Sequence, residues 1–479
     1  MPVAVVWLRR NLRLDDNRVL DAALRAADAV VPVFVLDDHY LEDDYSPPRL
    51  AFLAASLSEL AAALQAKGGR LVVRNGPAGD ALAALCRETG ADAVFTHADH
   101  EPHGKALHDE ARRTLAAQGT SFHAVEDLLL LPPGRLATQE GKPFTVYTPF
   151  SRRWLEADKP SPVPEPVRVP APDAVLSAAF PSIPLEKPRG FRETGAPANP
   201  EAGAAAARRT WDAFRASALF RYAAERDRPD LEGTSRLSPH LRFGTIGIRR
   251  VLAEARAAWK DAPAEGRKGI ETFVKELAWR EFYAGILHAF PRVLTENFRK
   301  DFDAFPWVSG EEEARRFAAW AEGRTGYPIV DAGMRQLLAE GWMHNRVRMI
   351  VASFLTKDLL IDWRRGEAFF RRHLADGDPA SNNGGWQWAA GCGTDAQPFF
   401  RIFNPVLQGT KFDPAAAYVT RWIPELAHVA AKPAELHAPW TLTSPPADYP
   451  APVVDHAAAR AAALAAFATL AAFATLKKG

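Results

Sequence analysis

The sequence predicts an α/β N-terminal domain built on a parallel sheet, followed by an all-α C-terminal domain. Three observations lead to this fold class. Short β-branched runs alternate with Ala/Leu-rich amphipathic stretches over about the first 130 residues. Proline then becomes frequent up to about residue 200, and beyond it the pattern is helical and rich in Trp, Phe and Arg. A chain of 479 residues is also too long for one ordinary hydrophobic core.

The N-terminal region, assigned to residues 1–131, contains runs typical of buried strands. Apolar runs separated by helices indicate βαβ units and a parallel, Rossmann-like sheet. The first run is followed by WLRRNLRLDDN instead of GxGxxG, so the ordinary dinucleotide-binding fingerprint is absent. Strands are expected at Val3–Leu8, Ala29–Leu36, Arg70–Arg74 and Ala93–Thr96. Helices are expected around Asp21–Ala27, Arg49–Gln65, Asp80–Glu88 and Lys105–Ala117.

A proline-rich region, residues 132–200, follows the first domain. Its composition is typified by KPSPVPEPVRVPAPD. Repeated proline sustains neither a helix nor a central strand, so an extended connector is expected. Residues 201–455 are assigned to the helical domain. Residues 456–479 form an alanine-rich tail in which AAFATL occurs twice in tandem, and a terminal helix is expected there.

Composition limits the class of protein. The two cysteines, Cys86 and Cys392, lie far apart and offer neither a disulfide framework nor a metal-ligand spacing, so a reducing compartment and no metal are expected. The N-terminus has no signal-peptide layout, and no apolar stretch reaches the ~20 residues of a spanning helix. A cytoplasmic protein without a membrane partner is therefore expected.

Net charge is +1, so any nucleic-acid-binding surface must be local. A basic excess does follow Trp342, and a solvated helix surface is the alternative interpretation of such a run. The excess consists of Arg346, Arg348, Lys357, Arg364, Arg365, Arg371 and Arg372 against Asp358, Asp362 and Glu367.

The segment GTSRLSPHLRFG, Gly233 to Gly244, predicts a phosphate-binding helix start. Ser238 before Pro239 is typical of an N-cap followed by the first helical residue. Thr234, Ser235 and Arg236 add hydroxyls and a guanidinium beside that positive helix end. The arrangement suits a phosphate or diphosphate, and a capped helix without a ligand is the alternative.

Two later segments share one helical spacing. KELAWREFY places Glu276, Trp279, Arg280 and Tyr283 at i, i+3, i+4 and i+7, and GWMHNRVRM repeats this spacing from Trp342 with Asn345, Arg346 and Met349. If both are helices, each presents an aromatic or soft apolar group beside polar groups on one face. Two such faces suit a planar heterocycle or a flipped base, whereas two partly exposed helices are the alternative.

A third segment is HLADGDPASNNGGWQWAAGCGTD, from His373 to Asp395. Its Asp-Gly, Asp-Pro and Asn-Gly-Gly steps are typical of turns, so a shaped loop running into a Trp-bearing segment is expected. The whole chain carries 13 tryptophans, more than packing usually requires.

These motifs, in this order, resemble the photolyase/cryptochrome family over nearly the whole chain. VVWLRRNLRLDDN is similar to the family's N-terminal signature, with Asn11 where the family usually has Asp. TGYPIVDAGMRQL and NNGGWQWAAGCGTDAQPFFRIFNP are similar to motifs of its helical domain. The resemblance implies an α/β domain, a long linker and a helical domain that holds FAD in a U-shaped conformation.

The resemblance also implies which residues hold FAD. Arg348 would pair with Asp376, and Asn382 would face flavin N5 and favour its reduced states. The implied FAD-binding residues are Tyr222, Thr234, Ser235, Arg236, Leu237, Ser238, Phe273, Arg348, Asp376, Gly377, Asp378 and Asn382.

The implied activity is light-dependent repair of cyclobutane pyrimidine dimers in UV-damaged DNA by a monomer. Excited FADH⁻ gives an electron to the flipped dimer, whose ring opens before the electron returns. Glu276 would stabilise charge at a thymine carbonyl, and Trp279 and Trp388 would stack on the extruded bases. Lesion contacts are implied for Arg226, Glu276, Trp279, Arg280, Tyr283, Asn345, Arg346, Met349 and Trp388. Trp307, Trp363 and Trp386 match the family's electron-transfer chain to the flavin.

Three alternatives are weighed against repair of these dimers. A cryptochrome photoreceptor tends to carry a different residue at Asn382 and to lose the set Trp279, Asn345, Met349 and Trp388, which is intact here. Enzymes for six-four photoproducts carry a His-rich version of MHNRVRM, and here His344 is followed by Asn345. A module of the electron-transfer-flavoprotein type explains the first domain only.

The antenna chromophore and the subclass stay open. DHEPHGK, Asp99 to Lys105, has Gly104 where folate-binding members have an acid, and is nearer the EPxGR pattern of deazaflavin binders. A second chromophore, deazaflavin or methenyltetrahydrofolate, is therefore undecided. SPHLRFG resembles a branch related to plant cryptochromes, the class III type, whereas WREFY and WQWAA suit the common bacterial class I equally well.

Overall fold

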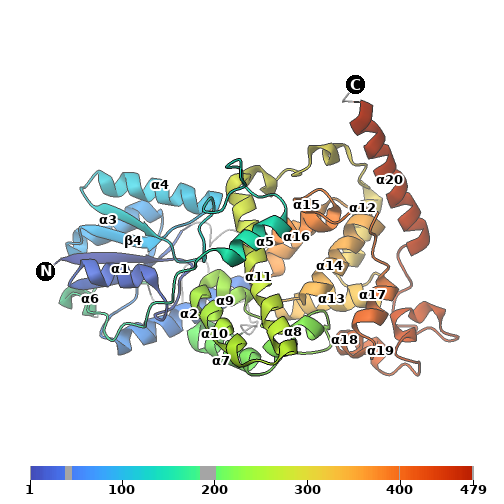
Figure 1. Ribbon diagram of the computed structural model, residues 1–479, viewed down its shortest axis with the longest axis horizontal. Helices are drawn as coiled ribbons and strands as arrows, with labels where there is room; N and C mark the ends of the chain where they lie inside the picture. The colour runs from blue at the N-terminus through green and yellow to red at the C-terminus, as the bar shows by residue number, and fades with distance from the viewer. Residues whose placement is uncertain (1, 38–45, 178, 184–200, 399, 477–479) are drawn as a thin grey trace.

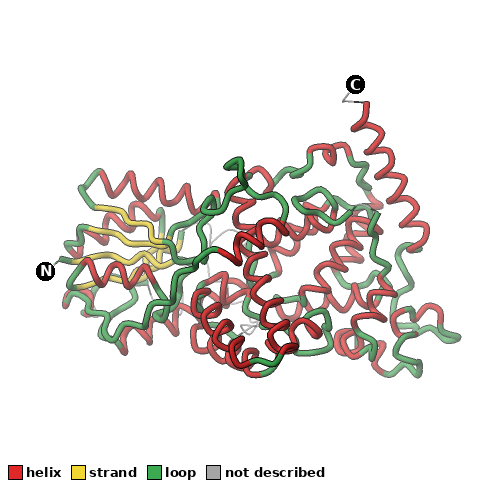
Figure 2. Tube along the Cα trace, viewed as in Figure 1, coloured by secondary structure: helices red, strands yellow, loops and turns green. Residues whose placement is uncertain are grey.

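A computed structural model describes the chain except for residues 1, 38–45, 178, 184–200, 399 and 477–479, and except for the side chains of 471–476. The molecule is elongated, with a sheet domain at one end and a helical domain at the other (Figure 1). Strands gather in the first domain, while the second is drawn in helices and loops (Figure 2). No helix of the described residues is long and apolar enough to cross a membrane.

The N-terminal domain contains a five-stranded parallel sheet of order β3-β2-β1-β4-β5. Strand order runs outward in both directions from β1, as in doubly wound folds, so the predicted α/β class is confirmed. The strands are β1 (Val3–Leu8), β2 (Ala29–Leu36), β3 (Val72–Asn75), β4 (Ala93–His97) and β5 (Ser121–Val125). The helices are α1 (Arg18–Ala26), α2 (Pro47–Ala66), α3 (Ala78–Thr89) and α4 (Pro102–Ala116).

Alternate residues of β1 face two separate hydrophobic cores. Val6 and Leu8 pack with residues of α1 and α2, whereas Val5 and Trp7 pack with residues of α3 and α4. β5 was not predicted, and β3 begins two residues later than predicted. Ser121–Val125 pairs only with β4 and leaves three of its residues exposed, so this edge strand lacks the apolar run of the central strands.

The proline-rich connector is not extended throughout. Residues 158–172 have no helix or strand, as expected, but α5 (Tyr147–Glu156) precedes them and α6 (Asp173–Leu176) follows. Pro149 lies in the first turn of α5, where a missing amide costs no helical hydrogen bond. The prediction of an extended segment is therefore wrong for α5, and residues 184–200 lie outside the described part.

Helices build the rest of the described chain. They begin with α7 (Gly203–Ala216), α8 (Ala218–Glu225), α9 (Ser238–Phe243), α10 (Ile248–Asp261), α11 (Ala264–Ala289), η2 (Pro291–Leu294), η3 (Lys300–Ala304), α12 (Glu311–Ala321) and α13 (Pro328–Glu340). They continue with α14 (Asn345–Ser353), the π-helix η4 (Phe354–Asp358), α15 (Trp363–His373), α16 (Pro379–Ala390), α17 (Pro405–Phe412), α18 (Ala417–Trp422), α19 (Pro424–Ala427), η5 (Glu435–His437), η6 (Pro439–Thr441) and α20 (His456–Leu476).

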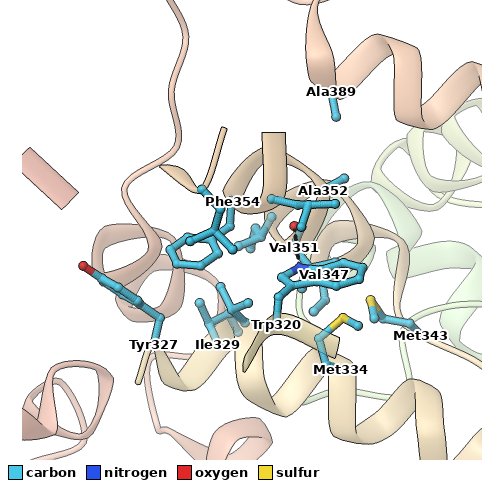
Figure 3. Close-up of a cluster of buried hydrophobic side chains, with 14 of the residues drawn as sticks. Trp320, Tyr327, Ile329, Met334, Met343, Val347, Val351, Ala352, Phe354 and Ala389 are labelled. Atoms are coloured by element: carbon cyan, nitrogen blue, oxygen red, sulfur yellow. Dashed lines mark hydrogen bonds between the residues drawn. The ribbon is translucent and has the colours of Figure 1, made fainter. Parts of the chain in front are cut away.

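The core of this domain surrounds α13 and α14. The indole N–H of Trp320 donates to the Val351 carbonyl at 3.1 Å, and Met334 and Val347 pack beside it (Figure 3). Gly333 lets α13 and α14 approach, because a Cβ there would collide with Val347. This tight packing fixes the helix that carries several predicted site residues.

The terminal helix α20 forms as expected, and it packs on the domain. The ring of Phe467 lies 4.9 Å from that of Phe305, centroid to centroid. His456 Nδ1 lies 2.5 Å from the buried Asp358 carboxylate in η4. The helix then projects from the body of the molecule (Figure 1).

A fully buried ion-pair cluster joins the two domains. Arg249 of α10 donates to the Asp16 carboxylate at 2.8 Å and to the Asp127 carboxylate at 2.6 Å. Arg13 also donates to Asp127, at 2.8 Å. Burial alone would raise the pKa of Asp127, but Arg13 and Arg249 hold it below its usual value. Gly247 belongs to the same contact, because a Cβ there would collide with the Asp16 carboxylate.

We predict that Arg249→Met lowers the free energy of unfolding by about 3–5 kcal/mol, because it leaves two buried carboxylates short of a partner. The neighbouring Arg250→Met is the control, since Arg250 pairs with a half-exposed Asp15. That variant should cost less than about 1 kcal/mol. Urea unfolding of the three proteins is the measurement, and equal losses in both variants would contradict a special role for the buried cluster.

Candidate functional site

A cavity of about 470 Å³ opens in the helical domain. Its walls come from the loop before α9 and from α11, α14 and α16, so it gathers all three motif regions. The predicted site residues that line it are Tyr222, Arg226, Thr234, Ser235, Arg236, Leu237, Ser238, Phe273, Glu276, Trp279, Arg280, Tyr283, Asn345, Arg348, Met349, Asp376, Asp378, Asn382, Trp386 and Trp388.

Four predicted residues lie outside the lining. Gly377 has φ +41°, and a Cβ there would collide with the Arg49 guanidinium, so its role is conformational. Arg346 pairs with Asp227 at 2.8 Å. Trp307 and Trp363 belong to the hydrophobic core behind the cavity.

Asp376 is the polar centre of one wall. It accepts a hydrogen bond from the Ser238 hydroxyl at 2.7 Å and from Arg348 at 2.9 Å. The pairing of Arg348 with Asp376 is therefore present. The prediction of Ser238 as the N-cap is wrong: α9 begins at Ser238 itself, and Leu237 precedes it without a side-chain cap. The hydroxyl binds Asp376 instead, across the cavity wall.

Arg236 adopts a left-handed backbone conformation, φ 49°. Its guanidinium lies 4.3 Å from the centroid of the Trp342 ring and 3.7 Å from Glu340. The Arg236 side chain borders the cavity while it stacks on this ring. Thr234 and Ser235 of the same loop add uncharged hydroxyl groups to the cavity wall.

The segment predicted as a turn at Asn383-Gly384-Gly385 is helical. It lies within α16, which starts at Pro379 after the Asp378 side chain caps the Ser381 amide at 2.8 Å. Gly384 is required by packing, because a Cβ there would collide with the Tyr283 ring. A Cβ at Gly385 would meet open space. The Asn-Gly-Gly step therefore thins the helix beside the cavity.

Asn382 has a fixed orientation. Its Nδ2 donates to the Glu367 carbonyl at 3.1 Å and to the Glu367 carboxylate at 2.8 Å. Both partners accept hydrogen bonds, so the amide carbonyl of Asn382 is the group left for the cavity. Burial raises the pKa of Glu367, while Arg371 and Asn382 oppose that rise.

Charges on the other cavity wall are paired. Arg226 forms an ion pair with Glu276, and its guanidinium also lies 3.8 Å from Asp227. Burial raises the pKa of Glu276, against the opposing effect of Arg226. Arg280 donates to the carbonyls of Leu128 and Leu241, at 3.0 and 3.3 Å.

Trp342 does not share a helix with the residues that follow it. α14 begins only at Asn345, with the Nδ1 of His344 accepting from the Arg346 amide at 3.2 Å as an N-cap. The predicted helix from Trp342 to Met349 is therefore wrong at its first member, although Trp342 does line the cavity. Burial lowers the pKa of His344 to about 4, so this cap is neutral at pH 7.

The basic excess after Trp342 is largely neutralised. Arg365 pairs with Glu313, and Lys357 is fully buried with its Nζ donating to the Arg401 carbonyl. Burial lowers the pKa of Lys357 to about 7. The remaining pairs are Arg346 with Asp227, Arg348 with Asp376, Arg364 with Asp362 and Arg371 with Glu367.

Trp386 connects the cavity to the core. It lines the cavity and is buried, and Gly366 of α15 makes room for its ring. The buried Trp363 donates its indole N–H to Asn297 at 2.8 Å, and Trp307 is partly buried in the same core. Trp320, which the sequence analysis did not single out, lies 6.0 Å from Trp386, centroid to centroid.

Several lining residues were missed. Arg242 and Ser381 lie within quoted motifs, so the motif itself was the available signal. The same holds for Leu241, Leu277, Met343 and Gly385, whereas Ala352 of α14 and Phe370 of α15 lie outside the quoted motifs. The missed lining residues are Leu241, Arg242, Leu277, Met343, Ala352, Phe370, Ser381 and Gly385.

The segment DHEPHGK lies at the domain interface. Asp99 is buried and pairs with Arg9 at 2.7 Å and with Arg10 at 2.6 Å. A side chain at Gly104 would collide with the Asp99 carboxylate, which explains why no acid stands at that position. Glu101 pairs with Arg10 and with Arg242 of α9.

The cavity combines features that suit FAD. Phe273, Leu277 and Phe370 supply apolar wall for a planar ring system, and Gly385 leaves open space where a side chain would stand. The hydroxyls of the 234–238 loop and the Asn382 carbonyl supply polar groups. The described residues contain no group of three or more His, Cys, Asp or Glu able to hold a metal ion.

Comparisons with known proteins agree with this architecture. The family model for DNA photolyase matches residues 4–170, and the model for the FAD binding domain of DNA photolyase matches residues 273–469. A deoxyribodipyrimidine photo-lyase of Halobacterium salinarum is 45% identical over 96% of this chain and 98% of its own length.

Solved structures are similar over nearly the whole chain. A bacterial class III photolyase from Agrobacterium tumefaciens superposes with a TM-score of 0.89 at 39% identity, covering 98% of both chains. A cryptochrome of Synechocystis superposes with a TM-score of 0.86 at 27% identity, covering 97% of this chain and 98% of its own.

We predict that the site loses stability in acid through His344. Its folded pKa of about 4 lies below the ordinary 6.5, so the unfolded chain binds more protons between these values. Stability is therefore complete above about pH 6.5 and falls as pH drops towards 4. His344→Asn keeps a capping side chain without this titration, and should remove about 2 kcal/mol of the loss between about pH 7 and pH 5.

Urea unfolding at the two pH values measures this effect. The control is His428→Asn, at an exposed position. The buried His108 and His240, whose pKa values burial also lowers to about 4, keep part of the slope in every protein. An unchanged slope in His344→Asn would contradict the neutral cap.

Proposed function

Because the chain belongs to the DNA photolyase family, we propose that it acts as a deoxyribodipyrimidine photo-lyase, which splits cyclobutane pyrimidine dimers in DNA with light. The supporting observation is that one cavity joins the polar groups suited to FAD with the flat rings of Trp279 and Trp388. A cofactor and a flipped dimer would then meet without water between them. We further propose that the enzyme works as a monomer in the cytoplasm on UV-damaged DNA.

FAD is the cofactor, and when bound and reduced it supplies the excited electron that opens the dimer. Arg348, Asp376 and Ser238 would orient it from one wall through their mutual hydrogen bonds. Asn382 would present its carbonyl oxygen to the flavin ring, because Glu367 holds the amide nitrogen. The other predicted FAD-binding residues, except Gly377, line the same cavity.

Trp279 and Trp388 would stack on the extruded pyrimidines, since aromatic faces accept any base. Asn345 and Met349 would complete the lesion side of the cavity. Glu276 would stabilise charge that develops at a pyrimidine carbonyl. Burial raises the pKa of its carboxyl, and the neighbouring Arg226 opposes that rise. Its ion pair with Arg226 holds the carboxyl at the cavity wall.

Trp386, Trp363 and Trp307 are proposed as the relay that supplies electrons from the surface. Trp386 borders the cavity, Trp363 is fully buried and Trp307 is partly buried, which is the order such a relay needs. For a second chromophore, deazaflavin and methenyltetrahydrofolate both stay candidates.

We predict that the purified chain carries about one FAD per chain, and that Asp376→Ala weakens FAD binding about tenfold or more. The variant removes the acceptor shared by Arg348 and Ser238, and hydrogen bonds to charged groups contribute about 1.5–3 kcal/mol. Flavin absorbance after gel filtration is the measurement. The exposed Asp448→Ala is the control, and a folded parent that neither carries nor takes up FAD would refute the cofactor assignment.

The repair proposal is tested by binding to matched oligonucleotides with and without a thymine dimer. Trp279→Ala should shrink the preference for dimer DNA by about fivefold to a hundredfold, because base stacking contributes about 1–3 kcal/mol. The dependence on salt should stay nearly unchanged, since that reports phosphate contacts. Trp259→Ala, in an exposed tryptophan of α10, is the matched control. The proposed function is refuted if the parent shows no preference for dimer DNA at any salt concentration and illumination does not reverse the dimer.

A further inference from the structure

Tyr147 lies flat against Trp279. The ring centroids are 3.6 Å apart and the planes differ by 6°, which is a full face-to-face stack. Tyr147 belongs to α5 in the connector, whereas Trp279 belongs to α11 and borders the cavity. A segment outside the helical domain's own sequence thus covers one face of a residue proposed to touch the lesion.

The whole of α5 is held in register along α11. Its buried residues Tyr147, Phe150 and Trp154 recur at i, i+3 and i+7, on one face of the helix. The Phe150 ring lies 5.5 Å from that of Phe282, and the Trp154 indole N–H donates to Glu281 at 2.6 Å. α5 lies beside α11 (Figure 1). It cannot slide along that helix without breaking the contacts of all three side chains.

Tyr147 is fixed by a hydrogen bond as well as by the stack. Its hydroxyl donates to the Lys275 carbonyl at 2.7 Å, one turn before Trp279 on α11. The ring is thus held both at its hydroxyl and across its face, so it acts as a rigid backing for its partner.

Other rings restrict Trp279 only partly. Phe282 meets it edge-on, with centroids 5.6 Å apart and planes at 86°. Tyr283 lies 5.5 Å away at 29°. Neither covers the indole face at van der Waals distance, as Tyr147 does. Without Tyr147 the Trp279 ring would gain rotational freedom that DNA binding would have to remove.

We propose that Tyr147 is a positioning residue for lesion recognition, which holds the Trp279 indole in the orientation that stacks on a flipped pyrimidine. The inference rests on the proposed function. Preorganisation of this kind strengthens binding because less side-chain entropy is lost in the complex. It acts on dimer DNA specifically, since intact DNA does not place a base against Trp279.

The experiment compares Tyr147→Leu and Tyr147→Met, which remove the stack, with Tyr147→Phe, which keeps it. Aromatic pairs contribute about 0.5–1.5 kcal/mol beyond burial, so the aliphatic variants should lose about two- to tenfold of the preference for dimer over intact DNA. Tyr147→Phe should keep most of it. Phe150→Leu is the matched control, because it loosens α5 in the same way but against Phe282.

A second measurement reads the orientation of Trp279 without DNA or light. In FAD-loaded protein carrying 5-fluorotryptophan, the fluorine resonance of Trp279 is assigned by its loss in Trp279→Phe. One narrow resonance is expected in the parent and in Tyr147→Phe. Broadened or multiple resonances are expected in the aliphatic variants, and Phe150→Leu should resemble the parent.

The outcomes separate the two proposals. The role of Tyr147 is overturned if the aliphatic variants keep both the narrow resonance and the preference for dimer DNA. It is equally overturned if Phe150→Leu loses as much preference as they do, since α5 would then matter only as a structural element. A parent without preference for dimer DNA refutes the proposed function instead, while the fluorine spectrum still reports whether Tyr147 holds Trp279.

Discussion

The buried cluster of Arg249, Asp16 and Asp127 is the contact on which the arrangement of the two domains depends. Both carboxylates come from the N-terminal domain, and the guanidinium comes from α10 of the helical domain. Three and four residues beyond Asp127, the amides of Leu130 and Leu131 donate to Glu281 on α11. The same stretch of chain therefore ties the sheet domain first to α10 and then to α11, the helix that carries much of the cavity wall. Charges buried this completely tolerate little displacement, because neither carboxylate has water to replace a lost partner.

The sequence predicted the parts that local patterns determine. The central strands β1 and β2 were found at their true bounds because both faces of them are apolar, and most cavity residues were found through motifs. Ser121–Val125 was missed because an edge strand shows no such run. Gly384 is interpreted as part of a turn because the sequence does not show that Tyr283 packs where its side chain would stand. α5 was not predicted because the region was judged by its high proline content. The helical spacing of Tyr147, Phe150 and Trp154 within it was not considered.

Charge illustrates the same limit. The basic run after Trp342 looked like a surface for phosphates, yet its partners include Asp227 and Glu313, which are distant in the chain. Arg226, implied as a lesion contact, forms an ion pair with Glu276 that the local sequence does not show. Pairing between distant residues follows from the fold and cannot be counted from a local sequence. The electrostatics of binding must therefore be judged from exposed, incompletely paired cations and not from the composition of a segment.

Glu276 and Glu281 show how one helix serves both structure and chemistry. Both lie on α11, and burial raises the pKa of both. Glu281 is buried and accepts hydrogen bonds from two backbone amides and from the Trp154 indole, so its carboxylate serves the packing of α11. Glu276 borders the cavity with Arg226 as its ion-pair partner. The two acids lie more than a turn apart on α11. Helix α5 contacts Glu281 directly through Trp154, and through Tyr147 it contacts Trp279, three residues after Glu276. Glu281 of α11 therefore holds α5 in place through Trp154. Tyr147 of α5 in turn holds the Trp279 ring at the cavity wall.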